Sequence, residues 1–223
     1  MDIHTINVGI SNCYLLRDRG IVLIDAGVPG RINTFEKSFK RFNVDPHDIK
    51  AIVITHCHWD HVGSLKELRN LTGAKVIAHK NDADHLEKGE LIVPPGVTRW
   101  GKLLGVLLKG IGRKESTEPN KIDIILGEED FSLGEFGIPG KILFTPGHSR
   151  GSISVVLDTG EAFVGDTAMS GFPLTIGPNL PVFAEDLPLL KESWTKLIDR
   201  GAKMIYPGHG KPFPIEKLIN RCF

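Results

Sequence analysis

The chain has few cysteines, no net charge and no secretory signal at its start. Its 223 residues include 3 cysteines, and 27 Lys and Arg residues balance 27 Asp and Glu residues. Three cysteines cannot all pair within one chain, which argues against a disulfide framework and for a reduced protein. The first residues, Met1 to His4, lack the charged-then-apolar profile of a signal sequence. We therefore expect a cytoplasmic protein.

The balanced charge and the short apolar runs also limit the partners. A nucleic-acid interface needs a basic stripe, and no bulk excess of Lys and Arg is available to form one. The apolar run within residues 89–120 is too short and too interrupted to span a bilayer. We expect a small-molecule substrate, no nucleic acid and no spanning membrane segment.

One segment carries most of the chemical information. Residues 55–63 read Thr-His-Cys-His-Trp-Asp-His-Val-Gly and follow an apolar run, 49–54, that is typical of a buried strand. Imidazole nitrogen together with carboxylate oxygen suits zinc, iron or manganese better than calcium or magnesium. Cys57 alternates away from its neighbours, so we expect a buried thiol there and not a ligand. This His-rich loop supplies four potential metal ligands: His56, His58, Asp60 and His61.

Three later turns each present one more potential ligand. Each turn follows a strand-like apolar run and contains glycine, which marks a turn. The repeated position at strand ends predicts that all four loops open at one edge of the sheets. The three ligands are His148, Asp166 and His209.

This pattern resembles that of the metallo-β-lactamase fold superfamily. That superfamily has a His-x-His-x-Asp-His loop followed by a single His, an Asp and a final His, and all seven positions are present here in that order. Segments 12–16 and 21–27 are also similar to the superfamily's first hairpin. The resemblance covers nearly the whole chain. It implies an α/β fold, a four-layer αββα sandwich with the metal site between the sheet edges.

The resemblance further implies two divalent metal ions, with zinc expected and iron or manganese as alternatives. A carboxylate has two oxygens and can span two cations about 3.5–4 Å apart. Asp60 is the candidate to orient the attacking water and to shuttle its proton, while Asp25, Thr145 and Thr167 could orient imidazole N–H groups. The implied ligand sets are His56, His58 and His148 for one ion, Asp60, His61 and His209 for the other, and Asp166 for both.

The implied activity is hydrolysis of a lactone, an ester or a thioester by a metal-held hydroxide. Dedicated β-lactamases of the superfamily usually carry Cys or Ser in place of Asp166, so weak β-lactamase activity is a minor alternative, as is a phosphodiesterase or phosphotriesterase. The alternative from another reaction class is a persulfide dioxygenase with one Fe(II), held by His56, His148 and Asp166. Such relatives keep the same motif, so the motif does not separate the two classes.

Hydrophobic periodicity predicts the order of the elements. Strands from both halves must meet to build the metal site, so we expect one domain over 1–223, with two packed sheets and helices outside. Helices are expected over 31–42, 63–72, 80–88, 187–200 and 214–220. Strands are expected over 3–8, 12–17, 20–25, 49–55, 74–78, 122–126, 130–133, 141–145, 152–158, 161–165 and 202–206.

Residues 89–120 depart from this alternation of strands and helices. Apolar residues from Trp100 to Leu108 recur at helical spacing, but three glycines would weaken an isolated helix by up to about 1 kcal/mol each relative to Ala. We expect a helical insertion that serves as a cap over the site or as a homodimer surface, with membrane contact the least favoured alternative. Trp100 and, in the loop 170–181, Phe172 are candidate substrate contacts.

Overall fold

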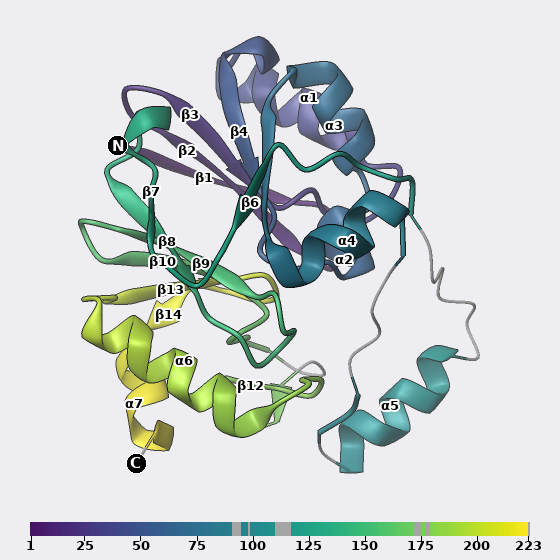
Figure 1. The fold of residues 1–223 in the computed structure, drawn as a ribbon, viewed down its shortest axis with the longest axis vertical. Coiled ribbons are helices and arrows are strands. Elements are labelled where there is room, and N and C mark those ends of the chain that lie inside the picture. The colour runs from purple at the N-terminus through teal and green to yellow at the C-terminus, as the bar shows by residue number, and fades with distance from the viewer. Residues whose placement is uncertain (91–94, 98, 110–116, 172–174, 177–178, 223) are drawn as a thin grey trace.

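The central strands are buried on both faces, so each needs a packed layer on two sides. In the computed structural model, two six-stranded sheets pack face to face, with helices on their outer sides (Figure 1). The structure describes residues 1–90, 95–97, 99–109, 117–171, 175–176 and 179–222.

The first sheet is built from the N-terminal half of the chain, and its strands lie in chain order. The first three strands pair antiparallel, and the next pairings, from β3 to β6, are parallel. Parallel neighbours need crossover connections, and helices supply them. The strands are β1 (Asp2–Asn7), β2 (Asn12–Arg17), β3 (Ile21–Ile24), β4 (Ile49–Val53), β5 (Lys75–His79) and β6 (Ile124–Leu126). The helices are α1 (Ile32–Arg41), η1 (Pro46–Asp48), α2 (Trp59–Val62), α3 (Leu65–Thr72) and α4 (Lys80–Lys88).

The second sheet comes from the C-terminal half and has the order β14-β13-β10-β9-β8-β7. Only one of its pairings, β10 with β13, is parallel, and α6 makes that crossover. The strands are β7 (Phe131–Ser132), β8 (Gly140–Phe144), β9 (Ile153–Leu157), β10 (Glu161–Gly165), β13 (Met204–Pro207) and β14 (Phe213–Pro214). The remaining elements are η2 (Gly134–Phe136), the small hairpin of β11 (Thr175–Ile176) and β12 (Leu180–Pro181), α6 (Leu187–Asp199) and α7 (Glu216–Cys222).

Three apolar clusters separate the layers. Phe35 and Phe39 of α1 belong to the cluster against the first sheet, Phe163 to the cluster between the sheets, and Trp194 of α6 to the cluster behind the second sheet. Each of these four side chains is at most 1% exposed, and burying one such side chain is worth about 1.5–3 kcal/mol. The predicted four-layer αββα sandwich is confirmed.

The helix expected over 63–72 is α3, and an additional single turn, α2, precedes it. The single turn α2 lies inside the His-rich loop, and α3 begins only at Leu65. A Cβ on Gly63 would lie 2.2 Å from the Pro29 nitrogen, and the Ser64 hydroxyl donates to the Val28 carbonyl. This junction therefore packs against the loop after β3, a tertiary contact that helical periodicity does not report. The strands β11, β12 and β14 were not predicted, because two residues show no alternation.

The helical insertion is confirmed as α5 (Arg99–Lys109), which Figure 1 shows set apart from both sheets. Trp100 is partly buried, but Leu103 is 53% exposed and Val106 is 69% exposed. The apolar stripe is therefore uncovered at Leu103 within one chain, and the role of the insertion as a cap or a homodimer surface stays a prediction. Phe172 lies outside the described residues.

A short backbone ladder ties the insertion to the rest of the fold. The Val97 N–H donates to the Val182 carbonyl at 3.0 Å, and the Ala184 N–H donates to the Pro95 carbonyl at 3.2 Å. These bonds flank a bridge between Gly96 and Phe183. In the described part of the chain, no helix combines the length and apolar character that a bilayer crossing requires.

Candidate metal centre

Four loops meet where β4, β8, β10 and β13 end. The seven candidate ligands that the sequence predicts lie on these loops. All seven residues are buried in the structure, and none is more than 8% exposed. Buried ionisable side chains need a partner of opposite charge, hydrogen bonds or a metal. The seven residues are His56, His58, Asp60, His61, His148, Asp166 and His209.

The seven side chains form two groups that one carboxylate joins. Within each group the potential ligand atoms lie within 4.8 Å of one another. Asp166 Oδ2 lies 3.8 Å from His56 Nε2, 3.5 Å from His148 Nε2 and 3.4 Å from His209 Nε2. Its Oδ1 lies 3.2 Å from His61 Nε2. Asp166 therefore contacts histidines of both groups. The groups are His56, His58, His148 and Asp166, and Asp60, His61 and His209.

Hydrogen bonds on the outer side fix the orientation of three imidazoles. His148 Nδ1 lies 2.9 Å from the Phe183 carbonyl, and His209 Nδ1 lies 2.6 Å from the Ile10 carbonyl. His61 Nδ1 lies 2.8 Å from Asp25 Oδ2. Carbonyl and carboxylate oxygens only accept, so each Nδ1 must carry the proton. Each ring therefore directs its Nε2 into the cluster.

A relay through Thr55 orients the fourth ring. The Thr55 hydroxyl donates to the Asp25 carboxylate at 2.9 Å, and its oxygen then accepts from His56 Nδ1 at 3.0 Å. Asp25 adopts a left-handed backbone with φ 62°. Gly165 leaves room for the relay, because a Cβ there would lie 2.4 Å from Thr55 Oγ1. The predicted orienting role of Asp25 is confirmed, and Thr55 is an addition that the sequence did not indicate.

The free donor atoms fit a cation. Within the described residues, His56 Nε2 and His58 Nε2 are buried and have no hydrogen-bond partner. His58 Nδ1 lies 2.9 Å from His148 Nε2, so one shared proton or one shared cation must separate these two nitrogens. Imidazole nitrogens and carboxylate oxygens converging in this way suit zinc, iron or manganese.

In the metal-free cluster, each charged side chain shifts the pKa of its neighbours. Burial raises the pKa of Asp60, but the hydrogen bond from His209 and the charges of His61 and His209 outweigh it and hold this pKa at about 2. Burial lowers the pKa of His209, but Asp166 and Asp60 outweigh it and raise this pKa to about 10. Burial and the neighbouring histidines keep the pKa of His58 well below its usual value. The carboxylates are thus ionised, and a cation that binds here displaces protons from the rings.

Two predicted orienting residues do not contact an imidazole. The Thr145 hydroxyl pairs with Ser154 Oγ at 2.7 Å, and the Thr167 hydroxyl lies 3.5 Å from the Thr145 carbonyl. The prediction for Thr145 and Thr167 is therefore wrong: their hydroxyls pair with Ser154 and with a backbone carbonyl instead. Cys57 is fully buried in the cluster between the first sheet and its helices, as its alternation predicted.

Sequence reasoning missed Asp82, a buried carboxylate in the first turn of α4. Its Oδ2 accepts the Cys57 N–H at 2.9 Å and lies 3.3 Å from Ser149 Oγ. In the sequence, Asp82 has the appearance of an ordinary acidic residue near a helix start, a position that the helix dipole favours. Only the tertiary structure shows that it touches two of the four loops.

The stability of the metal-free protein should depend on Asp82 in a defined pH window. Burial raises the pKa of Asp82 from 3.8 to about 6, although hydrogen bonds from Cys57 and Ser149 oppose the shift. Between these values the folded state binds more protons than the unfolded state, so the free energy of unfolding should fall by about 3 kcal/mol as pH rises through the window. Urea unfolding of Asp82→Asn between pH 4 and 7 should lack this slope. The exposed Asp84→Asn should keep it, and a wild-type slope in Asp82→Asn would contradict the assignment.

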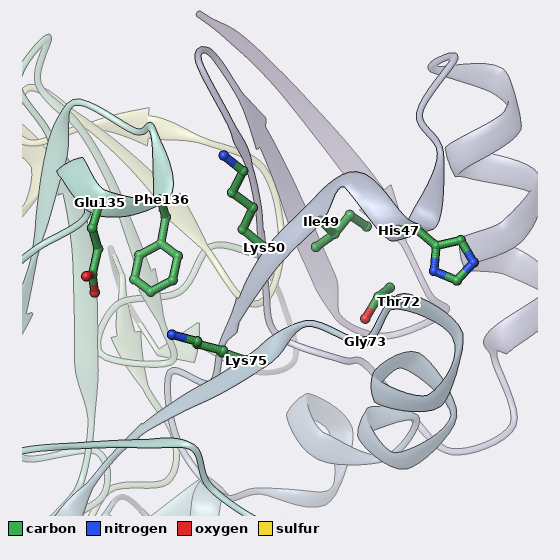
Figure 2. A pocket seen from close by; sticks show the side chains of 8 residues that line it. All are labelled: His47, Ile49, Lys50, Thr72, Gly73, Lys75, Glu135 and Phe136. Carbon is green, nitrogen blue, oxygen red and sulfur yellow. The ribbon is translucent and has the colours of Figure 1, made fainter.

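A hollow lies at the opposite end of the parallel strands from the candidate metal centre (Figure 2). It has a volume of about 410 Å³ and is formed where β4 and β5 begin, away from the loops that follow their carboxyl ends. Its charged side chains are exposed, and it includes none of the seven buried residues. The hollow is therefore not the candidate metal centre. It is lined by His47, Ile49, Lys50, Thr72, Gly73, Lys75, Glu135 and Phe136.

Comparison with known families agrees with this geometry. The family model described as the metallo-beta-lactamase superfamily matches residues 6–209, which include all four loops. The chain belongs to the metallo-beta-lactamase superfamily.

Individual relatives match over most of the chain. The probable metallo-hydrolase MJ0888 of Methanocaldococcus jannaschii is 29% identical over 206 residues, which cover 90% of this chain and 88% of that protein. The metallo-beta-lactamase fold-containing protein ST1585 of Sulfurisphaera tokodaii is 31% identical over 190 residues, which cover 85% of this chain and 68% of that protein. A crystal structure of ST1585 matches with a TM-score of 0.67 at 25% identity, and the match covers 99% of this chain and 84% of that one. The crystal structure of BLEG-1 B3 metallo-beta-lactamase matches with a TM-score of 0.70 at 25% identity, and the match covers 99% of this chain and 97% of that one.

Proposed function

We propose that this protein is a hydrolase that uses two divalent metal ions to cleave a lactone, an ester or a thioester. The observation that carries the proposal is the position of Asp166, whose two oxygens contact histidines of both groups. One carboxylate between two clusters of nitrogen donors suits a two-metal site. Relatives named as probable metallo-hydrolases support the reaction class.

We propose that each of the two groups of side chains binds one metal ion. His56, His58 and His148 would hold one ion, and Asp166 would be shared with the other. Three of the imidazoles in the cluster offer Nε2 because a carbonyl or carboxylate holds their Nδ1 proton. Zinc is the expected metal, with iron or manganese as alternatives. The second ion would be held by Asp60, His61 and His209.

When bound, two such ions polarise a carbonyl oxygen and lower the pKa of water towards neutrality. The protein's own contribution is placement and proton handling. Asp60 Oδ2 lies 3.1 Å from His209 Nε2, and the Ser11 hydroxyl donates to the Asp60 carbonyl at 2.7 Å. We propose that Asp60, fixed in this way, orients the attacking water and receives its proton.

The helical insertion is the proposed wall of the substrate site. Its ladder pairs Gly96 with Phe183, and the Phe183 carbonyl holds His148. A Cβ on Gly105 would lie 3.5 Å from the Phe183 ring, so α5 packs beside a residue that orients a candidate ligand. We propose that Trp100 contributes to an apolar wall for an acyl-bearing substrate, and that a second copy of the chain could cover the exposed Leu103.

Metal content is the test of this proposal. Protein purified without chelators and without added metal should contain close to two ions of zinc, manganese or a mixture per chain by elemental analysis. It should also hydrolyse members of a lactone, ester and thioester panel, and the activity should disappear after chelation and return with the metal. Two bound ions with no activity on the panel would overturn the proposed substrate class, while a chain that binds no ion would overturn the proposed site.

The second candidate is a persulfide dioxygenase with one Fe(II). One group of the cluster contains the three residues that this reading requires, His56, His148 and Asp166. A single iron per chain together with oxygen uptake in the presence of a persulfide would favour it over the hydrolase. Because BLEG-1 is a B3 metallo-beta-lactamase, a β-lactam belongs in the panel, along with a phosphodiester and a phosphotriester.

A further inference from the structure

Asp82 is a buried carboxylate outside the seven candidate ligands. It is 1% exposed, and one of its oxygens, Oδ1, has no hydrogen-bond partner in the described part of the chain. Gly151 closes over this oxygen, because a Cβ on Gly151 would lie 2.2 Å from it. Burying a carboxylate without a compensating cation is costly. The position of Asp82 in the first turn of α4 does not by itself account for the burial of its carboxylate.

The other oxygen of Asp82 joins two loops that carry candidate ligands. Asp82 Oδ2 accepts the Cys57 N–H at 2.9 Å, and the peptide that it holds lies between His56 and His58. The same oxygen lies 3.3 Å from the hydroxyl of Ser149, the residue after His148.

Ser149 is itself held firmly. Its backbone N–H donates to Ser152 Oγ at 3.0 Å, and its hydroxyl lies 2.9 Å from the same oxygen. The network therefore runs from the His-rich loop through Asp82 and Ser149 into the turn before β9. It links the backbones next to His58 and His148, whose ring nitrogens are 2.9 Å apart.

We propose that Asp82 is a positioning residue, which sets the spacing of His58 and His148 by accepting hydrogen bonds from both loops and so determines how tightly the first metal ion binds. The inference rests on the proposed two-metal function. Residues that support metal ligands from behind change metal affinity about 10–100-fold when they are replaced. Asp82 supports the loop backbones and not an imidazole N–H, so its effect should fall on the group that contains His58 and His148.

The test is a stepwise cobalt(II) titration of the metal-free full-length chain, followed by visible absorption. The His58→Ala variant identifies the titration step that belongs to the His58 and His148 group. Asp82→Ala is expected to weaken that step about 10–100-fold and to leave the other step within a factor of about 2. Asp82→Asn keeps an oxygen that can accept the Cys57 N–H and should restore most of the affinity. Asp84→Ala, on the exposed side of α4, should match the wild type.

Four outcomes test the inference and the function on which it rests. Wild-type affinity in Asp82→Ala would overturn the inference, and an Asp82→Asn variant as weak as Asp82→Ala would show that charge, and not the hydrogen bonds, matters. If Asp82→Ala does not fold, Ser149→Ala removes one hydrogen bond with little change in volume and should weaken the same step; unchanged affinity there would also overturn it. A wild-type chain without two titration steps would instead count against the proposed function itself.

Discussion

Replacing Asp166 with Asn is expected to remove at least one metal ion per chain and to reduce hydrolysis about 10³-fold. The Asp166 carboxylate contacts histidines of both groups, so its charge is the feature that both ions would share. Electrostatic stabilisation by a bound metal is worth several kcal/mol in the transition state, and each 1.36 kcal/mol corresponds to a tenfold change in rate. Elemental analysis and steady-state rates on the best substrate of the panel would measure both effects.

The matched control is Asp158→Asn, in the exposed turn between β9 and β10. It makes the same chemical change on the same hairpin as Asp166, and it should leave both metal content and rate unchanged. An Asp166→Asn chain that keeps two ions and its activity would show that this carboxylate does not join two metals. Loss of activity with both ions retained would point to a role for Asp166 in the reaction itself and would revise the ligand set.

The sequence predicted the residues of the candidate site well because each of them stands where a strand ends. An apolar run followed by a turn places a side chain at the sheet edge, and the edges of both sheets come together in this fold. The pattern therefore identified all seven side chains that the structure brings together, although their role as metal ligands stays a prediction. The layers were predictable for a related reason, because buried faces such as that of α6 repeat at helical spacing.

The groups that orient these side chains could not be predicted in the same way. The carbonyls of Ile10 and Phe183 hold His209 and His148, and a backbone carbonyl leaves no mark in a sequence. Thr145 was predicted to orient an imidazole N–H, yet its hydroxyl pairs with Ser154 Oγ of β9. Asp82 was missed because its role depends on a contact between α4 and two distant loops. The sequence therefore predicts which candidate ligands lie at strand ends, but the groups that orient these ligands depend on tertiary packing.

Replacing Gly208 with Ala is expected to reduce activity at least about 100-fold and to lower metal content without unfolding the protein. A Cβ at this position would lie 2.5 Å from Asp166 Oδ1 and 2.5 Å from His61 Cε1, which is closer than real Cβ contacts allow. The backbone has no room to retreat, because the Gly208 N–H donates to the Gly165 carbonyl at 2.7 Å and its carbonyl accepts the Asn12 N–H at 2.8 Å. The methyl group must therefore displace Asp166 and His61, the pair that would connect the two ions.

The Gly208→Ala variant is informative because it should cost little folding stability but a large part of the reaction rate. Overpacking by one methyl group costs about 1–3 kcal/mol, which most domains tolerate, whereas a displacement of about 1 Å in a catalytic group can cost about 100-fold in rate. Gly127→Ala is the control, because Gly127 has open space around its position and no positive φ; it should keep metal content, rate and thermal midpoint. Wild-type metal content and rate in Gly208→Ala would mean that Asp166 and His61 can both move without consequence. The two carboxylate oxygens of Asp166 could then not be what holds the two ions together.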